Sequence, residues 1–133
     1  MKLNFHHLAL LNAVLFFILA IVWMFAPARS LGMWGVEFNS SAGLVSRRSA
    51  ALYAGFAVMF FSARNAEPSP VRKALVRGIV VSCFILALLG ILEMSAGRAN
   101  RGILPAVCIE IAFGLAFLFV DHTHAPQGND IIK

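Results

Sequence analysis

Four long apolar segments, separated by short polar stretches, leave this chain few folds to adopt. They cover residues 8–26, 43–63, 71–94 and 101–120, and a polar tail follows over residues 121–133. A helix that crosses the hydrocarbon core of a bilayer, about 30 Å thick, needs about 20 mostly apolar residues. The pattern predicts an all-α integral membrane protein. Residues 1–133 form one domain in this prediction, an antiparallel bundle of four transmembrane helices.

The composition favours membrane insertion and argues against nucleic-acid binding. Hydrophobic residues make up 60% of the chain and charged residues 13%, compared with about 45–50% and about 25% in soluble domains. The net charge of +5 fits basic residues that flank the segments, beside anionic lipid headgroups. Basic and aromatic residues do not alternate as in nucleic-acid-binding segments. The expected partner is therefore the lipid bilayer, together with other membrane subunits or a homo-oligomer, and no nucleic acid.

The first segment and the stretch after it each admit two interpretations. A basic start and small residues after the apolar run resemble a secretory signal peptide, but the run is long for one, so we expect an uncleaved span. Pro27 removes a backbone donor and ends the helix. The stretch over residues 28–42 contains Trp34. We expect a loop that places its tryptophan in the interface, and the alternative is a short helix on the membrane surface or a re-entrant turn.

The second segment carries two arginines that a membrane helix must accommodate. Its uninterrupted apolar run, Ser49–Phe61, has 13 residues. That is about 20 Å of helix, which is shorter than the hydrocarbon core. To span the bilayer, the helix has to include Arg47 and Arg48. At least one arginine then lies below the membrane surface, where an unpaired charge is costly.

Two glutamates are candidate partners for these arginines. Glu110 lies in the middle of the last apolar segment, and Glu93 lies near the end of the third, at the same membrane face. We predict a buried cluster of Arg47, Arg48, Glu93 and Glu110. Because intramembrane ionisable residues are functional candidates by default, three roles stay open. The cluster is an ion pair that sets helix register, a polar pocket for an anionic or amphipathic lipid-like molecule, or a surface that docks another membrane subunit.

Small residues indicate where helices approach one another closely in lipid. They form one stripe of the third segment, at Ala74, Gly78, Ser82 and Gly90. Arg48 shares a helical face with Gly55. Glu110 shares one with Gly114. Both charges are therefore predicted to face neighbouring helices rather than lipid.

No pattern predicts a catalytic or metal centre. The weak metal candidates are the histidines of one membrane side, His6, His7, His122 and His124. Imidazole binds zinc, copper and iron, but their spacing matches no ligand motif, so we expect no metal and no cofactor. Cys83 and Cys108 form no CxxC pair. The hydrolase, metalloprotease and nucleotide-binding signatures are absent. We expect no catalytic residue, and catalysis would require Glu110 or Glu93 as a general acid or base.

Three features together resemble a known group of proteins. These are the arginines followed by LYAGFAVMFFSAR, the hairpin NAEPSPVRKALVRG and the late glutamate. The pattern resembles small bacterial four-helix inner-membrane proteins, the DoxX-like proteins and related families of unknown function. The positions that match are Arg48, Tyr53, Gly55 and Glu110. The resemblance implies a fold and a bacterial inner (cytoplasmic) membrane. The small multidrug exporters also have four helices, but their first helix carries an essential acidic residue that this chain lacks.

The basic residues favour a cytoplasmic location for both termini, because cytoplasmic loops are enriched in Lys and Arg. With four spans, both termini lie on one side, which carries six basic residues: Lys2, Arg64, Arg72, Lys73, Arg77 and Lys133. The other side carries five, or three if Arg47 and Arg48 count as intramembrane: Arg29, Arg47, Arg48, Arg98 and Arg101. We expect a non-enzymatic protein, either a structural or accessory unit or a binder of a lipid-like molecule. The alternative is a small transporter or a membrane-embedded enzyme that uses the same cluster.

Overall fold

The computed structural model describes the backbone of residues 4–122 and the side chains of residues 4–120, and all of its regular elements are helices. The helices are α1 (Phe5–Phe25), α2 (Pro27–Met33), α3 (Ser40–Ala63), α4 (Pro70–Ser95), the 3-10 turn η1 (Arg101–Ile103) and α5 (Leu104–His122). The prediction of an all-α fold is confirmed. The stretch after Pro27 begins with the short helix α2 and continues as a loop that carries Trp34, while its location at a membrane surface stays a prediction. Residues 123–133 of the predicted tail lie outside the described residues.

Local signals in the sequence explain where the helices begin. The side chains of Asn4, Asn39 and Ser69 precede α1, α3 and α4, and each accepts a hydrogen bond from a backbone N–H of the first turn. Such caps satisfy donors that have no partner inside the helix. Pro27 and Pro70 occupy the first positions of α2 and α4, where proline's missing N–H is not needed.

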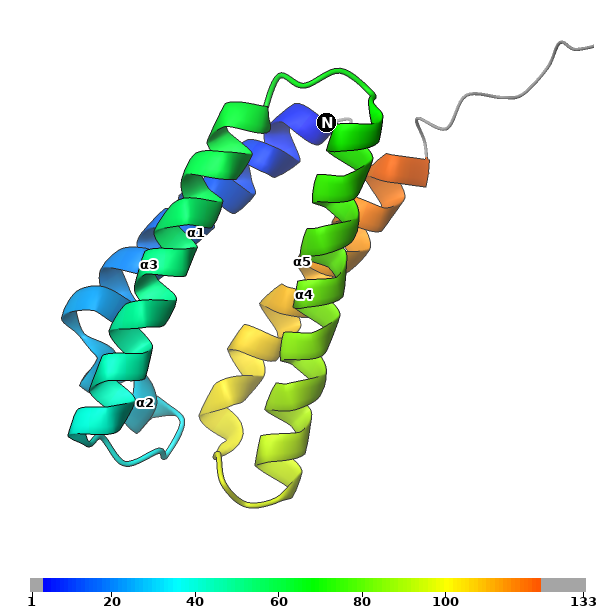
Figure 1. The fold of residues 1–133 in the computed structure, drawn as a ribbon. Coiled ribbons are helices and arrows are strands. Elements are labelled where there is room, and N and C mark those ends of the chain that lie inside the picture. The colour runs from blue at the N-terminus through cyan, green and yellow to red at the C-terminus, as the bar shows by residue number, and fades with distance from the viewer. Residues whose placement is uncertain (1–3, 123–133) are drawn as a thin grey trace, which may run out of the picture.

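The helices form two antiparallel hairpins (Figure 1). One consists of α1 and α3, which are joined through α2, and the other of α4 and α5. The hairpins pack against each other through α1 and α5, whereas α3 and α4 hardly touch although they are consecutive in the chain. The order around the molecule is therefore α3, α1, α5, α4, with an open side between α3 and α4.

The main hydrophobic core lies at the end of the molecule that carries the α3–α4 connection, here named the core end. Phe60 of α3 and Phe117 of α5 are fully buried there, with ring centroids 5.5 Å apart. The start of α1 contributes Phe5 and Leu8, and the first half of α4 contributes Val76. This core holds the two hairpins together at one end.

Loops hold the hairpins together at the opposite end, here named the junction end. The backbone N–H of Asn100 donates to the carbonyl oxygen of Trp34 at 2.7 Å. Gly35 has a φ of +74°, and a Cβ there would lie 2.9 Å from Asn100 Nδ2. A Cβ at Gly102 would overlap the carbonyl oxygen of Met33. The loop junction, Met33–Gly35 against Asn100–Gly102, therefore depends on two glycines for its close approach.

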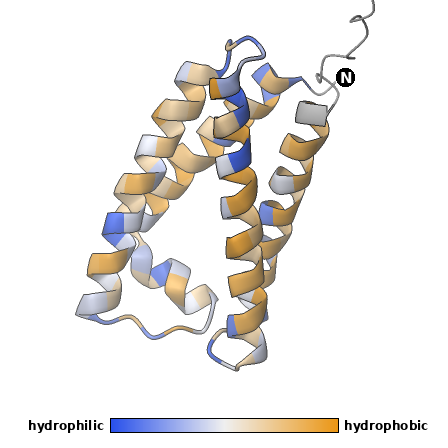
Figure 2. Ribbon diagram, turned by 45° about the vertical axis from the view of Figure 1, so that its right-hand side comes forward, coloured by the Kyte–Doolittle hydropathy of each residue, from blue (hydrophilic) through white to orange (hydrophobic). Residues whose placement is uncertain are grey.

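The outer surface suits a lipid environment. Large apolar side chains such as Phe17, Leu52 and Leu115 are exposed, and soluble proteins rarely expose apolar patches of more than a few hundred Å². Apolar residues fill the middle of the helices and polar ones gather toward the two ends (Figure 2). Three of the described helices are long and apolar enough to cross a membrane: α1, α4 and the Arg101–Val120 helix. These are the properties of a membrane protein.

The second predicted span is helical but falls outside that set of three. α3 has 24 residues, or about 36 Å of helix, so its length is sufficient. Its composition is less apolar because it includes Arg47, Arg48 and several serines. The four predicted segments thus correspond to four long helices, while membrane crossing by α3 stays a prediction.

Two glycine positions lie in close helix contact within the α4–α5 hairpin. A Cβ at Gly90 would lie 2.6 Å from Val107, and one at Gly114 would lie 3.4 Å from Cys83. By contrast, a Cβ at Gly78 or Gly55 would meet nothing within 4 Å. The predicted stripe on α4 therefore packs on α5 at Gly90 and is open at Gly78.

Candidate functional site: a cavity between the two hairpins

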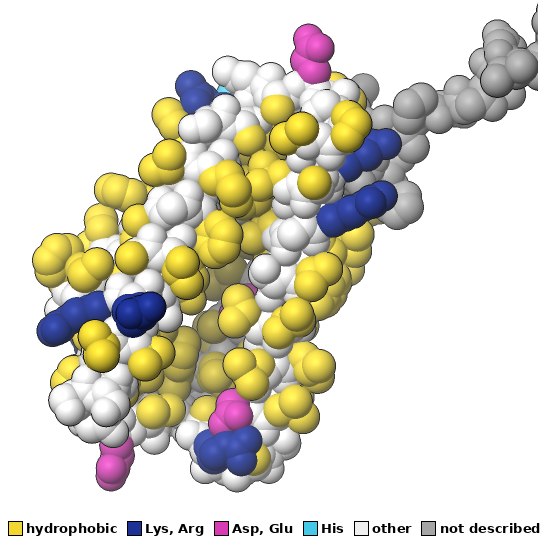
Figure 3. Space-filling model, viewed as in Figure 1, with side chains coloured by type: hydrophobic (Ala, Val, Ile, Leu, Met, Phe, Trp, Pro, Cys, Tyr) yellow, Lys and Arg dark blue, Asp and Glu magenta, His cyan; other side chains and the backbone are white. Residues whose placement is uncertain are grey.

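A cavity of about 170 Å³ lies between the core end and the junction end. All four long helices line it, and Trp34, which follows α2, contributes near the loop junction. The two hairpins are joined at both ends, but side chains do not fill the space between them. Figure 3 shows this hollow with hydrophobic side chains around it. The site is therefore a consequence of how the hairpins meet.

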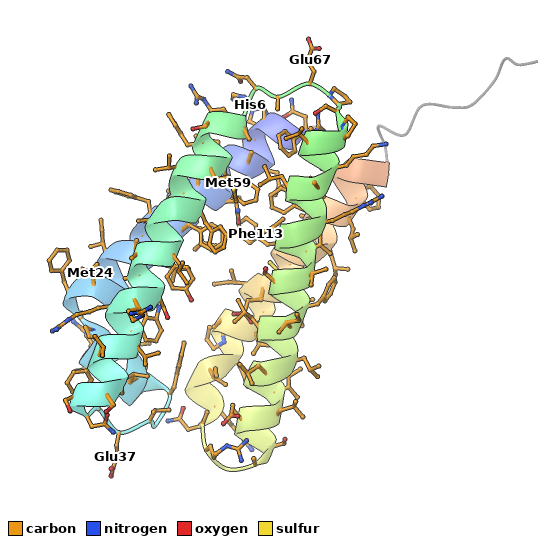
Figure 4. All side chains as sticks on the ribbon, viewed as in Figure 1. His6, Met24, Glu37, Met59, Glu67 and Phe113 are labelled. Carbon is orange, nitrogen blue, oxygen red and sulfur yellow. The ribbon has the colours of Figure 1, made fainter. Side chains whose placement is uncertain are left out.

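Six aromatic side chains line the cavity: Phe16, Trp23, Trp34, Tyr53, Phe56 and Phe113. Phe16 of α1 stacks on Tyr53 of α3, with ring centroids 5.8 Å apart and 21° between the planes. The rings of Trp23 and Trp34 lie 5.2 Å apart toward the junction end. Phe113 points into the space between the hairpins (Figure 4). The cavity thus presents several aromatic faces to whatever occupies it.

An acid and an amide in the cavity make no hydrogen bond with the described residues. Glu110 of α5 takes part in no hydrogen bond or ion pair of the described part of the chain. Asn12 of α1 is 2% exposed, and its Nδ2 has no hydrogen-bond acceptor there. Ser82, in contrast, donates to the carbonyl oxygen of Gly78 at 3.0 Å. Asn12 is buried and Glu110 is half-buried, and polar groups removed from water without partners are costly, which makes the two residues the functional candidates of the cavity.

Both candidates lie near the middle level of the helices. Asn12 is eight residues beyond its helix cap Asn4, about 12 Å from the core end of α1. Glu110 is nine residues beyond Arg101, about 13 Å from the junction end. Because the two helices enter from opposite ends, these depths place both polar groups away from either end of the molecule.

The cavity opens sideways between α3 and α4. A groove of about 290 Å³ lies on this side and is lined by residues of both helices, including Met59 and Gly78. The groove and the cavity share three lining residues, Phe56, Ile79 and Ser82. Because the outer surface of the helices is apolar, the opening faces the region where lipid is expected.

The structure does not bring the four residues of the predicted cluster together. Arg47 and Arg48 are exposed on α3, and the cavity lining includes neither of them. Glu93 binds Arg98, with Oε2 accepting from Nε at 2.6 Å and Oε1 accepting from Nη2 at 2.9 Å. This hydrogen bond to Glu93 also raises the pKa of Arg98. Glu93 thus pairs with Arg98, five residues along the chain, whereas Glu110 lines the cavity.

The described histidines hydrogen-bond to asparagines, and the rings of His6 and His7 also meet edge to face, with centroids 5.4 Å apart. His6 Nδ1 lies 2.8 Å from Asn65 Oδ1, and His7 Nδ1 lies 2.7 Å from Asn4 Oδ1. Within residues 4–120, no three His, Cys, Asp or Glu side chains gather as metal ligands. His122 is the last residue of α5 and its side chain is not described, and His124 lies outside the described residues.

Sequence reasoning missed Asn12 and, apart from Tyr53, the aromatic lining. One signal was present: Asn12 stands alone as an amide within the apolar run of residues 8–26, and a polar residue inside a membrane segment is a functional candidate. Trp34 carried no such signal, because the sequence does not reveal that its loop folds back toward Trp23. The convergence of these residues depends on how the hairpins pack.

No family model matches the chain, and neither a curated protein nor a solved structure is significantly similar to it. The resemblance to DoxX-like proteins therefore stays a prediction.

Proposed function

We propose that this chain is a multi-pass membrane protein that binds a lipid-like small molecule in the cavity between its hairpins. The observation that carries the proposal is the pair of unpartnered polar groups, Glu110 and the Asn12 amide, in an aromatic cavity. Ligand sites are typically apolar clefts with a few polar groups that orient the ligand. The sideways opening supports entry from the bilayer.

The proposal includes α3 as a fourth membrane helix in an antiparallel four-helix bundle. Arg47 and Arg48 lie about 10–12 Å from Ser40 along the helix axis. Long arginine side chains can extend along a helix so that the charge reaches the headgroup region. Their exposure on the outside of α3 fits this arrangement better than a buried ion pair.

We further propose a bacterial inner membrane with the core end in the cytoplasm. Four basic residues of the described chain gather at that end: Arg64, Arg72, Lys73 and Arg77. With Lys2 and Lys133 of the termini, the sequence assigns six basic residues to this side and five to the other, Arg47 and Arg48 included, and the positive-inside rule favours this end as cytoplasmic by that one residue. The membrane type rests on the DoxX-like resemblance alone, whereas the orientation is tested by the labelling experiment given in the Discussion.

The size of the cavity restricts what it can hold. At about 170 Å³ it is comparable to an engineered apolar cavity of about 150 Å³ that binds benzene. It therefore accommodates one ring or a short chain. A larger amphipathic molecule would place its head in the cavity and extend its tail through the opening between α3 and α4.

Tryptophan fluorescence provides a direct test. The chain has 2 tryptophans, and both line the cavity. We would titrate the full chain in lipid nanodiscs with bromobenzene, a single ring that quenches tryptophan through its heavy atom. The expected result is saturable quenching on top of the linear background from ligand dissolved in lipid.

Two matched variants on α5 make that test specific. Ala106→Phe fills the cavity, which Ala106 lines, and should abolish the saturable quenching. Ala112→Phe adds the same ring on the exposed face and should leave it intact. Identical, purely linear quenching in the wild type and both variants would overturn the proposal.

Transport and catalysis are the alternative uses of the cavity. A transporter needs access to its site from both sides of the membrane, whereas the core and the loop junction close the two ends of this cavity. A membrane-embedded enzyme would use Glu110 as an acid or base. Ligand binding requires neither a second opening nor a reacting partner for Glu110, and we therefore prefer it.

A further inference from the structure

We propose that the ligand of the cavity is a small amphipathic organic cation whose ammonium group pairs with Glu110. This inference rests on the proposed function and adds the chemical class of the ligand. It follows from what the cavity contains and from what it lacks.

The cavity holds an acidic group without a basic one. No arginine, lysine or histidine is among its lining residues in the described part of the chain. The cations of the junction half are engaged or directed elsewhere: Arg98 binds Glu93, and the other four are exposed, namely Arg29, Arg47, Arg48 and Arg101. At the core end, Arg72 stacks over the ring of Phe5 at 4.0 Å. An ionised carboxylate in an apolar site is stable only when a cation or several donors accompany it, and a cationic ligand would provide this.

The aromatic lining favours the same class of ligand. The face of an aromatic ring carries partial negative charge, and ring clusters bind quaternary ammonium groups for this reason. Phe16, Tyr53 and Phe113 come from three different helices and surround the same cavity as Glu110. An anion would meet both the carboxylate and the ring faces unfavourably, so the site discriminates by charge.

Asn12 adds a hydrogen-bonding requirement. Its buried Nδ2 is a donor without an acceptor among the described residues. An oxygen atom on the ligand, separate from the ammonium nitrogen, would accept this hydrogen bond. The cavity therefore matches a molecule with an apolar body, a cationic head and a hydrogen-bond acceptor.

Competition between two water-soluble rings of opposite charge tests the inference in the wild-type chain. Phenyltrimethylammonium and benzenesulfonate each carry a single ring and a permanent charge. With bromobenzene bound in nanodiscs, the cation should restore tryptophan fluorescence at a concentration at least about tenfold lower than the anion. Equal potency of the two, or a more potent anion, would overturn the inference even though saturable bromobenzene binding upholds the proposed function.

Two variants test whether Glu110 is the source of the preference for a cation over an anion. Glu110→Gln should lower the ratio of phenyltrimethylammonium to benzenesulfonate potency, measured in the same variant, by at least about tenfold. Glu110→Asp keeps the charge and should retain preference for the cation. Loss of bromobenzene binding in the wild type would count against the proposed function itself, whereas an unchanged ratio of cation to anion potency in Glu110→Gln would count against this inference alone.

Discussion

The backbone N–H of Asn100 donates to the carbonyl oxygen of Trp34 at 2.7 Å, and this hydrogen bond links the two helical hairpins at the junction end. Trp34 also packs against Trp23 and lines the cavity. The same residue thus takes part in the loop junction and in the wall of the candidate site. Disturbing the junction should therefore affect both stability and ligand binding.

Gly102→Ala should destabilise the protein and weaken binding. The added Cβ would overlap the carbonyl oxygen of Met33, and overpacking typically costs about 1–3 kcal/mol. Thermal unfolding in nanodiscs and bromobenzene quenching measure the two effects. Gly32→Ala is the matched control, because a Cβ at Gly32 meets nothing within 4 Å. Equal melting temperatures for the two variants would show that the junction does not constrain the fold.

Phe60→Ala should be among the most destabilising single substitutions. Phe60 is 0% exposed and packs against Phe117, and truncating a buried Phe to Ala costs about 3–5 kcal/mol. Phe17→Ala removes the same atoms from a side chain that is 59% exposed and should cost much less. The free energy of unfolding, measured by titration with SDS, should separate the two variants. Similar values would contradict the placement of the core.

Arg98→Ala should change neither stability nor ligand binding measurably. The ion pair with Glu93 is exposed, and exposed ion pairs contribute little because water and salt screen them. Melting temperature and bromobenzene quenching check this expectation. A clear loss of ligand binding would instead indicate that Glu93 and Arg98 contribute to the functional site. The predicted cluster already included Glu93.

Chemical labelling at the positions of two glutamates tests whether α3 crosses the membrane. Glu37 and Glu67 lie at opposite ends of the molecule, just before and just after α3 (Figure 4). In a Cys83→Ala, Cys108→Ala background, a membrane-impermeant maleimide added to intact cells should label Glu37→Cys but not Glu67→Cys. Labelling of both or of neither would place the two ends of α3 on one side. The reverse pattern would keep the fourth span and invert the orientation.

Gly78→Phe should slow ligand entry without harming the fold. A Cβ at Gly78 would meet nothing within 4 Å. This glycine lines the groove but not the cavity. A ring there narrows the opening between α3 and α4. Stopped-flow quenching by bromobenzene should show a lower association rate than in Val81→Phe, which adds a ring on an exposed face of the same helix. Identical rates would indicate another route into the cavity.

The four long helices could be predicted from the sequence, but the pairing of the charges could not. Apolar length and caps such as Asn4 and Ser69 act within a few residues, so they are readable from the chain. Arg48 and Gly55 do share a helical face, yet that face is open rather than packed. A shared face does not reveal which neighbour, or whether lipid, lies opposite it.

The sequence by itself determined the helices, their ends and their apolar surfaces, because hydropathy and capping are local properties of the chain. Tertiary structure decided that Glu110 and Asn12 share a cavity while Arg47 and Arg48 stay outside it. The rotation of each helix about its axis depends on packing between residues far apart in sequence, such as Phe60 with Phe117. It also depends on the loop junction at Trp34 and Asn100. These contacts leave the aromatic cavity between the hairpins.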